Sequence, residues 1–170
     1  MSRISLPVPA QPPSPSTPYR IAFVCLGNIC RSPMAHVVME QKLVEAGLGD
    51  LVEVTSSGTG GWHRGNPMDH RAAETLSGAG YDPSLHRARQ FDRSWFDRDL
   101  ILVMDRANLR DVNNLGDGPV LMFRDFDPAG RGEVPDPYYG GAEGFDNVLA
   151  MVERTCAAIV VQVRGLLRQT

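Results

Sequence analysis

The stretch IAFVCLGNICRSPMAH, residues 21–36, is the part of this chain that is most informative about its fold. It begins with four apolar residues, a continuous run typical of a strand that is buried on both faces. Cys25 ends that run, and Gly27 and Asn28 tolerate left-handed backbone angles, so the chain can curl with its N–H groups turned inward. Pro33 suits an early position of a helix. The stretch therefore predicts a strand, a tight loop and a helix.

The loop between this strand and this helix has the chemistry of an anion site. Amides that point inward and open onto a helix N-terminus bind anions, and the planar guanidinium of Arg31 can hold two oxygens of a phosphate. The same positive surroundings favour a thiolate at Cys25, which is the form that acts as a nucleophile. A lone cysteine is more often a small buried residue. The order Gly, Asn, Arg, Ser, Pro at a strand–helix junction favours the catalytic interpretation.

The rest of the chain alternates apolar runs with helical patterns. The expected strands are residues 20–24, 51–59, 99–105 and 119–123, and the expected helices are residues 33–46, 67–79, 106–114 and roughly the last 25 residues. A loop rich in Gly, Pro and Asp, residues 125–141, precedes the last helix. This order predicts an α/β fold with a single three-layer domain, in which helices flank a central parallel four-stranded sheet and the phosphate-binding loop follows the first strand. Ligands of such sheets bind at the carboxyl ends of the strands.

Composition limits the classes of partner. The 170 residues suffice for one domain with a full core. The net charge of -3 gives no reason to expect nucleic acid or an anionic membrane as a partner. Three cysteines do not make a disulfide framework in a chain of this length, and the four histidines do not cluster with them as metal ligands would. No apolar run approaches the length of a membrane span.

The first 18 residues, MSRISLPVPAQPPSPSTP, differ in composition from the rest. A secretory signal needs an unbroken apolar segment, and Pro7 and Pro9 interrupt the short apolar patch. We therefore expect residues 1–18 to be a disordered Pro/Ser-rich tail and residues 19–170 to be the folded domain. The expected location is the cytoplasm, and the expected state is a monomer.

Several motifs along the chain resemble one family. VCLGNICRSPMAH resembles the active-site loop of the low-molecular-weight protein tyrosine phosphatases of the bacterial type. SSGTGGWHRGNP is similar to the loop that lines that family's pocket, HRARQ and MDRANLRDV to its middle segments, and DPYYGG to its acid loop, so that the resemblance covers about residues 20–165. It implies hydrolysis of phosphotyrosine and small aryl phosphates through a phosphocysteine intermediate, with no cofactor and no metal. The implied partners are phosphotyrosine-containing proteins, with phosphate or another oxyanion in the loop.

The resemblance implies three catalytic residues. Cys25 is the expected nucleophile, and Arg31 is expected to hold the phosphate. Asp136 in VPDPYYGG is expected to protonate the leaving oxygen and then to activate water in the second step. Composition alone would favour an ordinary Asp-Pro turn at this position.

The resemblance also implies a pocket around these residues. Its expected walls are Trp62, Tyr138, Tyr139 and Leu26, although Trp62 taken alone could belong to the core. The other expected binding residues belong to the loop and are Gly27, Asn28, Ile29, Cys30 and Ser32. A supporting network is expected from Asn28, Ser32, His86 and Ser56, with Ser57 as the alternative to Ser56.

Two control mechanisms are known in the family that the chain resembles. The cysteine equivalent to Cys30 can form a reversible disulfide with the nucleophile, which protects it from irreversible oxidation. The alternative for Cys30 is a small buried residue under the loop. Tyr138 and Tyr139 correspond to tyrosines that can be phosphorylated.

Three other functions are compatible with parts of the sequence. A thioredoxin-coupled arsenate reductase on the same scaffold needs two further cysteines, and the chain has none between Cys30 and Cys156. Protein arginine phosphatases resemble this chain but have threonine at the position of Ile29 and phenylalanine in the acid loop, where this chain has Tyr138. A non-catalytic phosphate-binding module would be expected to lack Cys25, Arg31 or Asp136. The phosphotyrosine phosphatase is therefore the favoured function.

Overall fold

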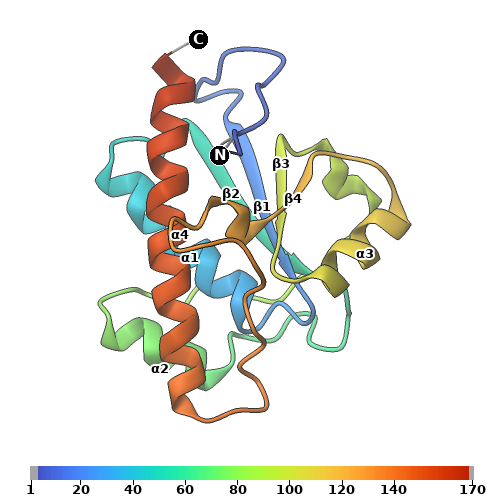
Figure 1. The fold of residues 1–170 in the computed structure, drawn as a ribbon, viewed down its shortest axis with the longest axis vertical. Helices are drawn as coiled ribbons and strands as arrows, with labels where there is room; N and C mark the ends of the chain where they lie inside the picture. Colours follow the sequence, from blue (N-terminus) through green and yellow to red (C-terminus); the bar gives the residue numbers. More distant parts are fainter. Residues whose placement is uncertain (1–3, 169–170) are drawn as a thin grey trace.

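The computed structural model describes residues 4–168, and its centre is a parallel four-stranded sheet with the strand order β2-β1-β3-β4 (Figure 1). The strands are β1 (Tyr19–Cys25), β2 (Val52–Gly58), β3 (Leu100–Val103) and β4 (Val120–Met122). The helices are α1 (Arg31–Glu45), α2 (His70–Gly78), α3 (Arg106–Leu115) and α4 (Ala142–Arg168), with short 3₁₀ helices η1 (Arg93–Asp97) and η2 (Phe123–Phe126). The α/β class and the parallel sheet expected from the sequence are confirmed.

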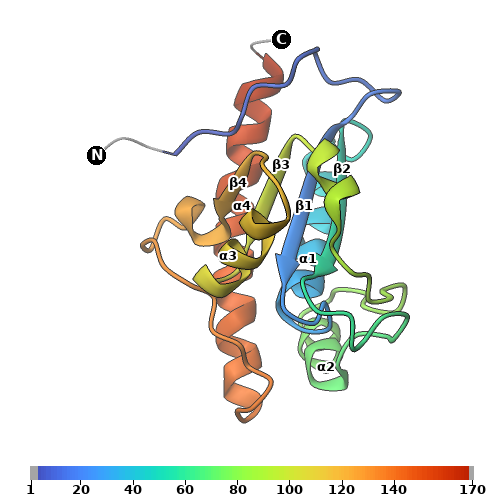
Figure 2. The same cartoon turned by 90° about the vertical axis from the view of Figure 1, so that its right-hand side faces the viewer.

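Both faces of the sheet are covered, which explains the unbroken apolar run of β1. Ile21 and Phe23 belong to a large core shared with α1, α2 and α4. Ala22 and Val24 point to the opposite face and pack in a smaller core with residues of η1 and α3. Figure 2 shows α1 and α4 on one side of the sheet and α3 on the other. Successive residues of a strand face opposite sides, so a strand between two helical layers must be apolar at every position.

The register of the strands brings the functional loop to one edge of the sheet. Cys25 at the end of β1 is paired with Gly58 at the end of β2. Gly58 lies directly under the loop after β1, because a Cβ added there would lie 2.6 Å from the Leu26 carbonyl oxygen and 2.9 Å from the Asn28 nitrogen. Only glycine permits this close approach of two backbones.

The N-termini of the helices differ in how they are capped. Asp69 caps α2 by accepting the Arg71 N–H at 2.9 Å, which is why α2 begins at residue 70 rather than at the predicted residue 67. Asp105 caps α3 in a reciprocal capping box with Asn108. Within residues 4–168, the Cys30 side chain that precedes α1 makes no capping hydrogen bond. The first-turn N–H groups of α1 are therefore not satisfied by a side-chain cap.

The segment before β1 is partly packed. Residues 4–18 form no helix or strand, and residues 1–3 of the predicted tail lie outside the described residues. The Gln162 side chain of α4 accepts the Leu6 N–H at 3.3 Å and donates to the Ile4 carbonyl at 2.9 Å. The Tyr19 hydroxyl donates to the Pro7 carbonyl at 2.8 Å. The start of this segment thus contacts α4, and the division between tail and domain stays a prediction.

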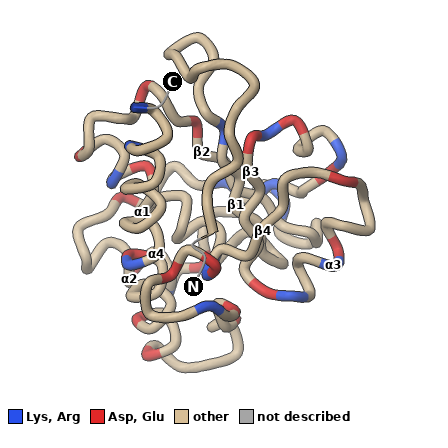
Figure 3. Tube along the Cα trace, turned by 45° about the horizontal axis from the view of Figure 1, so that its top comes forward, with Lys and Arg blue, Asp and Glu red and all other residues tan. Residues whose placement is uncertain are grey.

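Figure 3 shows acidic and basic residues interspersed along the helices and loops around the sheet. Among residues 4–168, no helix is both long enough and apolar enough to span a bilayer.

Candidate active site

The loop after β1 is held in a tight curl by Asn28. Its backbone has a φ of 55°, in the left-handed region that asparagine tolerates, whereas Gly27 does not adopt such an angle. The buried Asn28 side chain accepts the Arg89 N–H at 2.9 Å and donates to the Ser32 hydroxyl at 2.8 Å. The backbone carbonyl of Asn28 accepts from Nε2 of His86 at 2.7 Å. Two hydrogen bonds to the segment of residues 86–89 and one to the start of α1 therefore fix the residue that turns the loop.

Ser32 is bonded to the sulfur of Cys25. The Ser32 Oγ lies 2.9 Å from the Cys25 Sγ and 3.3 Å from the Ser57 carbonyl oxygen. Because Asn28 donates to Ser32, the hydroxyl proton is free to point to one of these two acceptors, and the sulfur is the closer one. A hydroxyl donor aimed at sulfur stabilises a thiolate.

His86 supports the loop as a neutral imidazole. A carbonyl can only accept, so the bond from Nε2 to the Asn28 carbonyl requires the hydrogen on Nε2. Burial lowers the pKa of His86, and the charges of His36 and Arg87 lower this pKa further, while the bond to Asn28 opposes them. The outcome is a lowered pKa, so His86 is a fixed donor.

Arg31 is a buried cation at the start of α1. Its Nη1 donates to Asp105 at 2.6 Å and to the Val134 carbonyl at 3.0 Å. Burial by itself would lower the pKa of Arg31, but the Cys25 sulfur and the bond to Asp105 raise it above its usual value. The guanidinium is therefore a permanent positive charge whose orientation is set from two other segments.

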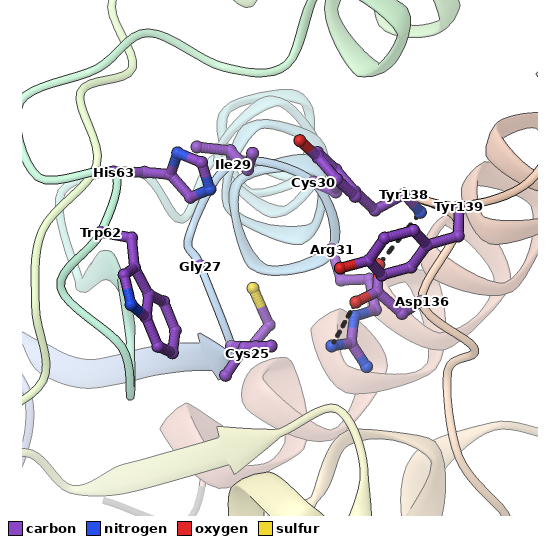
Figure 4. A pocket seen from close by; sticks show the side chains of 11 residues that line it. Cys25, Gly27, Ile29, Cys30, Arg31, Trp62, His63, Asp136, Tyr138 and Tyr139 are labelled. Carbon is purple, nitrogen blue, oxygen red and sulfur yellow. Dashed lines mark hydrogen bonds and ion pairs between the residues drawn. The ribbon is translucent and has the colours of Figure 1, made fainter.

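Asp136 lies across the cavity from the phosphate-binding loop. One carboxylate oxygen is 3.6 Å from Nη2 of Arg31, and the other accepts the Tyr138 N–H at 3.1 Å. In Figure 4 the Cys25 sulfur points into the space between Trp62 on one side and Asp136 and the two tyrosines on the other. A thiol, a guanidinium and a carboxyl group thus share one cavity.

The walls of this cavity are apolar and aromatic. Leu26 and Ile29 belong to the loop, Trp62 comes from the segment after β2, and Tyr138 and Tyr139 from the segment before α4. The cavity has a volume of about 290 Å³, at the small end of the usual range for ligand sites. The Trp62 side chain is exposed, which excludes the alternative of a core residue. A narrow cavity with aromatic walls fits a planar ring that carries a phosphate.

Comparison with known proteins agrees with this geometry. The family model described as "Low molecular weight phosphotyrosine protein phosphatase" matches residues 20–168. The chain belongs to this family. A low molecular weight protein-tyrosine-phosphatase of Streptomyces coelicolor is 46% identical over 155 residues, which cover 86% of this chain and 94% of that protein. The low molecular weight protein-tyrosine phosphatase A of Mycobacterium tuberculosis is 46% identical over 143 residues, covering 81% of this chain and 87% of that protein.

A solved structure shows the same fold. The crystal structure of a protein tyrosine phosphatase from Entamoeba histolytica, with Hepes in its active site, has a TM-score of 0.82 and 32% identity, and the match covers 86% of this chain and 97% of that chain. The chain is accordingly a protein-tyrosine phosphatase, a hydrolase of the low molecular weight family.

Most of the predicted site residues meet in this phosphatase. Those that line the cavity are Cys25, Leu26, Gly27, Ile29, Cys30, Arg31, Trp62, Asp136, Tyr138 and Tyr139. Asn28, Ser32 and His86 lie behind the loop in the network described above. Ser56 is not brought into that network. Its hydroxyl is bonded to Nδ1 of His36 at 3.0 Å, and the Ser57 carbonyl is the group that reaches Ser32.

Two residues of the phosphatase site were not predicted from the sequence. His63 lines the cavity and packs against the loop, since a Cβ on Gly27 would lie 3.0 Å from its Cδ2. Its position next to Trp62 in the quoted motif is a signal that could have identified it. Asp105, the partner of Arg31, directly follows the apolar run of β3, at the same edge of the sheet as Cys25.

Cys30 is a buried thiol under the loop. Burial raises the pKa of Cys30, and the Asp69 carboxylate and the Cys25 sulfur raise it further. Among the described residues all three cysteines are unpaired. In this state Cys30 fits the description of a small buried residue, and the regulatory disulfide stays a prediction.

Proposed function

We propose that the phosphatase hydrolyses phosphotyrosine in proteins in two steps, with Cys25 as nucleophile and Asp136 as acid and then base. In the first step the Cys25 sulfur forms a bond to phosphorus while the bond to the phenolic oxygen breaks, and Asp136 gives its proton to that oxygen. In the second step water forms a bond to phosphorus, gives a proton to Asp136, and the bond between sulfur and phosphorus breaks. At the end of the cycle Asp136 has regained its proton and Cys25 its thiolate electron pair.

Charge stabilisation comes from the protein itself. Arg31 and the backbone amides of the loop would hold the three equatorial oxygens of the phosphoryl group, so that the proposal requires no metal. Ser32 would stabilise the thiolate as it leaves phosphorus. The observation that carries the proposal is the meeting of Cys25, Arg31 and Asp136 in one cavity with aromatic walls.

The aromatic walls support phosphotyrosine over smaller phosphate esters. Trp62 and Tyr138 come from segments on opposite sides of the sulfur and leave room for a ring between them (Figure 4). A longer side chain than serine or threonine is needed for a phosphate to reach the bottom of such a cavity. The partner proteins, the cytoplasmic location and the monomeric state stay predictions from the sequence.

The arsenate reductase alternative has little support. It needs a cysteine relay that carries a disulfide outward. Cys156 is fully buried in α4, and its sulfur faces the Ala35 carbonyl at 3.8 Å. Burial raises the pKa of this thiol, which disfavours the reactive thiolate.

The experiment is phosphate release from a phosphotyrosyl peptide in excess chelator, with Cys25→Ser as the control. Turnover that persists in chelator and is abolished in Cys25→Ser is the expected result. Phosphate that stays covalently bound to the denatured wild-type protein and is absent from Cys25→Ser would identify the phosphocysteine. A folded wild-type protein without turnover would contradict the proposal, and the same assay with a phosphoarginine peptide and with arsenate would then separate the two alternatives.

A further inference from the structure

The segment that carries Asp136 has few backbone ties to the rest of the described protein. Its start is fixed, because the Val134 N–H donates to the Met104 carbonyl at 2.8 Å and the Val134 carbonyl accepts from Arg31. Residues 135–141 form no helix or strand. Among the described residues, their backbone hydrogen bonds are local: the Tyr138 N–H donates to the Asp136 side chain, the Gly140 N–H to the Pro137 carbonyl, and the Gly141 carbonyl accepts from the Gly144 N–H. The position of the acid therefore depends on side-chain contacts.

Arg71 makes such a contact. Its guanidinium carbon lies 5.3 Å from the centroid of the Tyr138 ring and 4.8 Å from that of the Phe145 ring. Phe145 is fully buried in the first turns of α4, so it does not move independently of the helix. Contacts of a guanidinium with aromatic faces are attractive. One cation thus holds a wall of the cavity to the helix that follows it.

Arg71 itself is fixed by Asp69. The Asp69 carboxylate accepts from Arg71 Nε at 3.2 Å and from Nη2 at 3.0 Å, and it also caps α2 through the Arg71 N–H. The Asp69 N–H in turn donates to the Ile29 carbonyl of the phosphate-binding loop at 2.9 Å. A continuous series of contacts therefore runs from the nucleophile's loop through Asp69 and Arg71 to Tyr138.

This series of contacts continues from Tyr138 to the proposed acid, Asp136. The Tyr138 N–H is one of the two groups that Asp136 contacts, and the other is Arg31 at 3.6 Å. A displacement of Tyr138 would therefore displace the carboxyl group. Proton transfer needs the acid within hydrogen-bond distance of the leaving oxygen, so a shift of about 1 Å is enough to slow it strongly.

We propose that Arg71 is a positioning residue for the acid step, which holds Asp136 in register with Cys25 by clamping Tyr138 to α2 and α4. The proposal rests on the role of Asp136 given under Proposed function. The competing role is purely structural: Arg71 supports the start of α2 and the fold. The two roles differ in what they do to the dependence of rate on the leaving group.

The experiment compares kcat/KM for phenyl phosphate and 4-nitrophenyl phosphate, whose leaving groups differ in their need for a proton. For Arg71→Gln we expect a loss of about 10-fold or more on phenyl phosphate and of less than about 3-fold on 4-nitrophenyl phosphate. Arg71→Lys keeps the charge but loses the planar fork, and an intermediate loss on phenyl phosphate is expected. Arg71→Lys also serves as the second variant if Arg71→Gln does not fold.

Arg154→Gln is the matched control. Arg154 also donates two hydrogen bonds to one aspartate, Asp127, but within residues 4–168 it has no hydrogen bond or ion pair with a residue that lines the cavity. We expect equal effects on the two substrates in this variant. Equal losses in the Arg71 variants, measured on protein shown to be folded by its thermal transition, would overturn the proposal.

Two further variants separate this proposal from the acid assignment. Asp136→Asn should lower kcat/KM more for phenyl phosphate than for 4-nitrophenyl phosphate. If it does not, the assignment of Asp136 as the acid fails. If Asp136→Asn does so and Arg71→Gln does not, only the role of Arg71 fails. In a Tyr138→Ala background, Arg71→Gln should add no further selectivity, because the clamp is already lost. A full additional effect there would overturn the route through Tyr138.

Discussion

The carboxylate of Asp105 holds the guanidinium of Arg31 at 2.6 Å, across 74 residues of sequence. Arg31 begins α1 and Asp105 follows the apolar run of β3, and the two meet because β1 and β3 are parallel neighbours. The same aspartate caps α3. One side chain therefore fixes the helix after β3 and aims the arginine of the phosphate-binding loop.

This double role can be separated by mutation. Asn is as good a helix cap as Asp but carries no charge, so Asp105→Asn should lower kcat/KM for a phosphotyrosyl peptide by about 10–10²-fold while α3 keeps its cap. Asp105→Ala should lose the cap as well, at an additional cost of about 1 kcal/mol in the free energy of unfolding. Peptide kinetics and urea unfolding measure the two effects. Wild-type kcat/KM in Asp105→Asn would show that Arg31 needs no counter-charge.

Ser32 should matter most when sulfur leaves phosphorus. Ser32→Ala removes the hydroxyl 2.9 Å from the Cys25 sulfur, and loss of a hydrogen bond to a charged group predicts a decrease in kcat of about 10–10²-fold. Phosphocysteine should accumulate, seen as a burst of nitrophenol before a slow steady state. Ser57→Ala is the control, since it keeps the backbone carbonyl that reaches Ser32. A decrease in KM and kcat without a burst would contradict this step assignment.

Gly58→Ala should disrupt the loop from below. The added methyl group would lie 2.6 Å from the Leu26 carbonyl oxygen, and backbone atoms cannot yield as a side chain can. We expect a displaced loop and a loss of kcat/KM of about 10²-fold. Gly78→Ala at the end of α2 meets nothing within 4 Å and should leave kcat/KM unchanged. If both variants retain wild-type activity, Gly58 does not set the loop's position.

His86 should make stability depend on pH. In the folded protein its pKa lies below the usual value of 6.5, mainly because of burial. As the pH falls, the unfolded chain therefore binds a proton at this residue before the folded protein does. Stability from this group is present above the unfolded pKa and is lost as the pH falls below it. The free energy of unfolding should therefore decrease from pH 7.5 to pH 5.5 through this residue.

Urea unfolding at the two pH values measures this effect. His86→Gln should flatten the pH dependence, although it lowers stability at pH 7.5 by loss of the bond to the Asn28 carbonyl. His70→Gln, at an exposed position in the first turn of α2, should retain the wild-type pH dependence. If the free energy of unfolding of His86→Gln depends on pH as in the wild type, groups other than His86 cause that dependence.

Much of the secondary structure could be predicted because its causes are local. β1, β3 and β4 contain short apolar runs, and α4 has a long amphipathic pattern, so the sequence predicts their ends within a few residues. α2 begins at residue 70, three residues after the start that the sequence pattern predicts, because Asp69 caps it. η1 and η2 were not predicted, since a single 3₁₀ turn is too short to produce a periodic pattern.

The amino-acid sequence alone predicts the chemistry of the loop after β1, the order of strands and helices, and Cys25, Arg31 and Asp136 as candidate catalytic residues. The folded structure determines which side chains meet. It joined Arg31 to Asp105, brought Arg71 to Tyr138, and turned the Ser56 hydroxyl to His36 rather than to the loop. The reason is physical: strand order and register bring distant loops to one edge of the sheet, and no local pattern encodes which of them become neighbours.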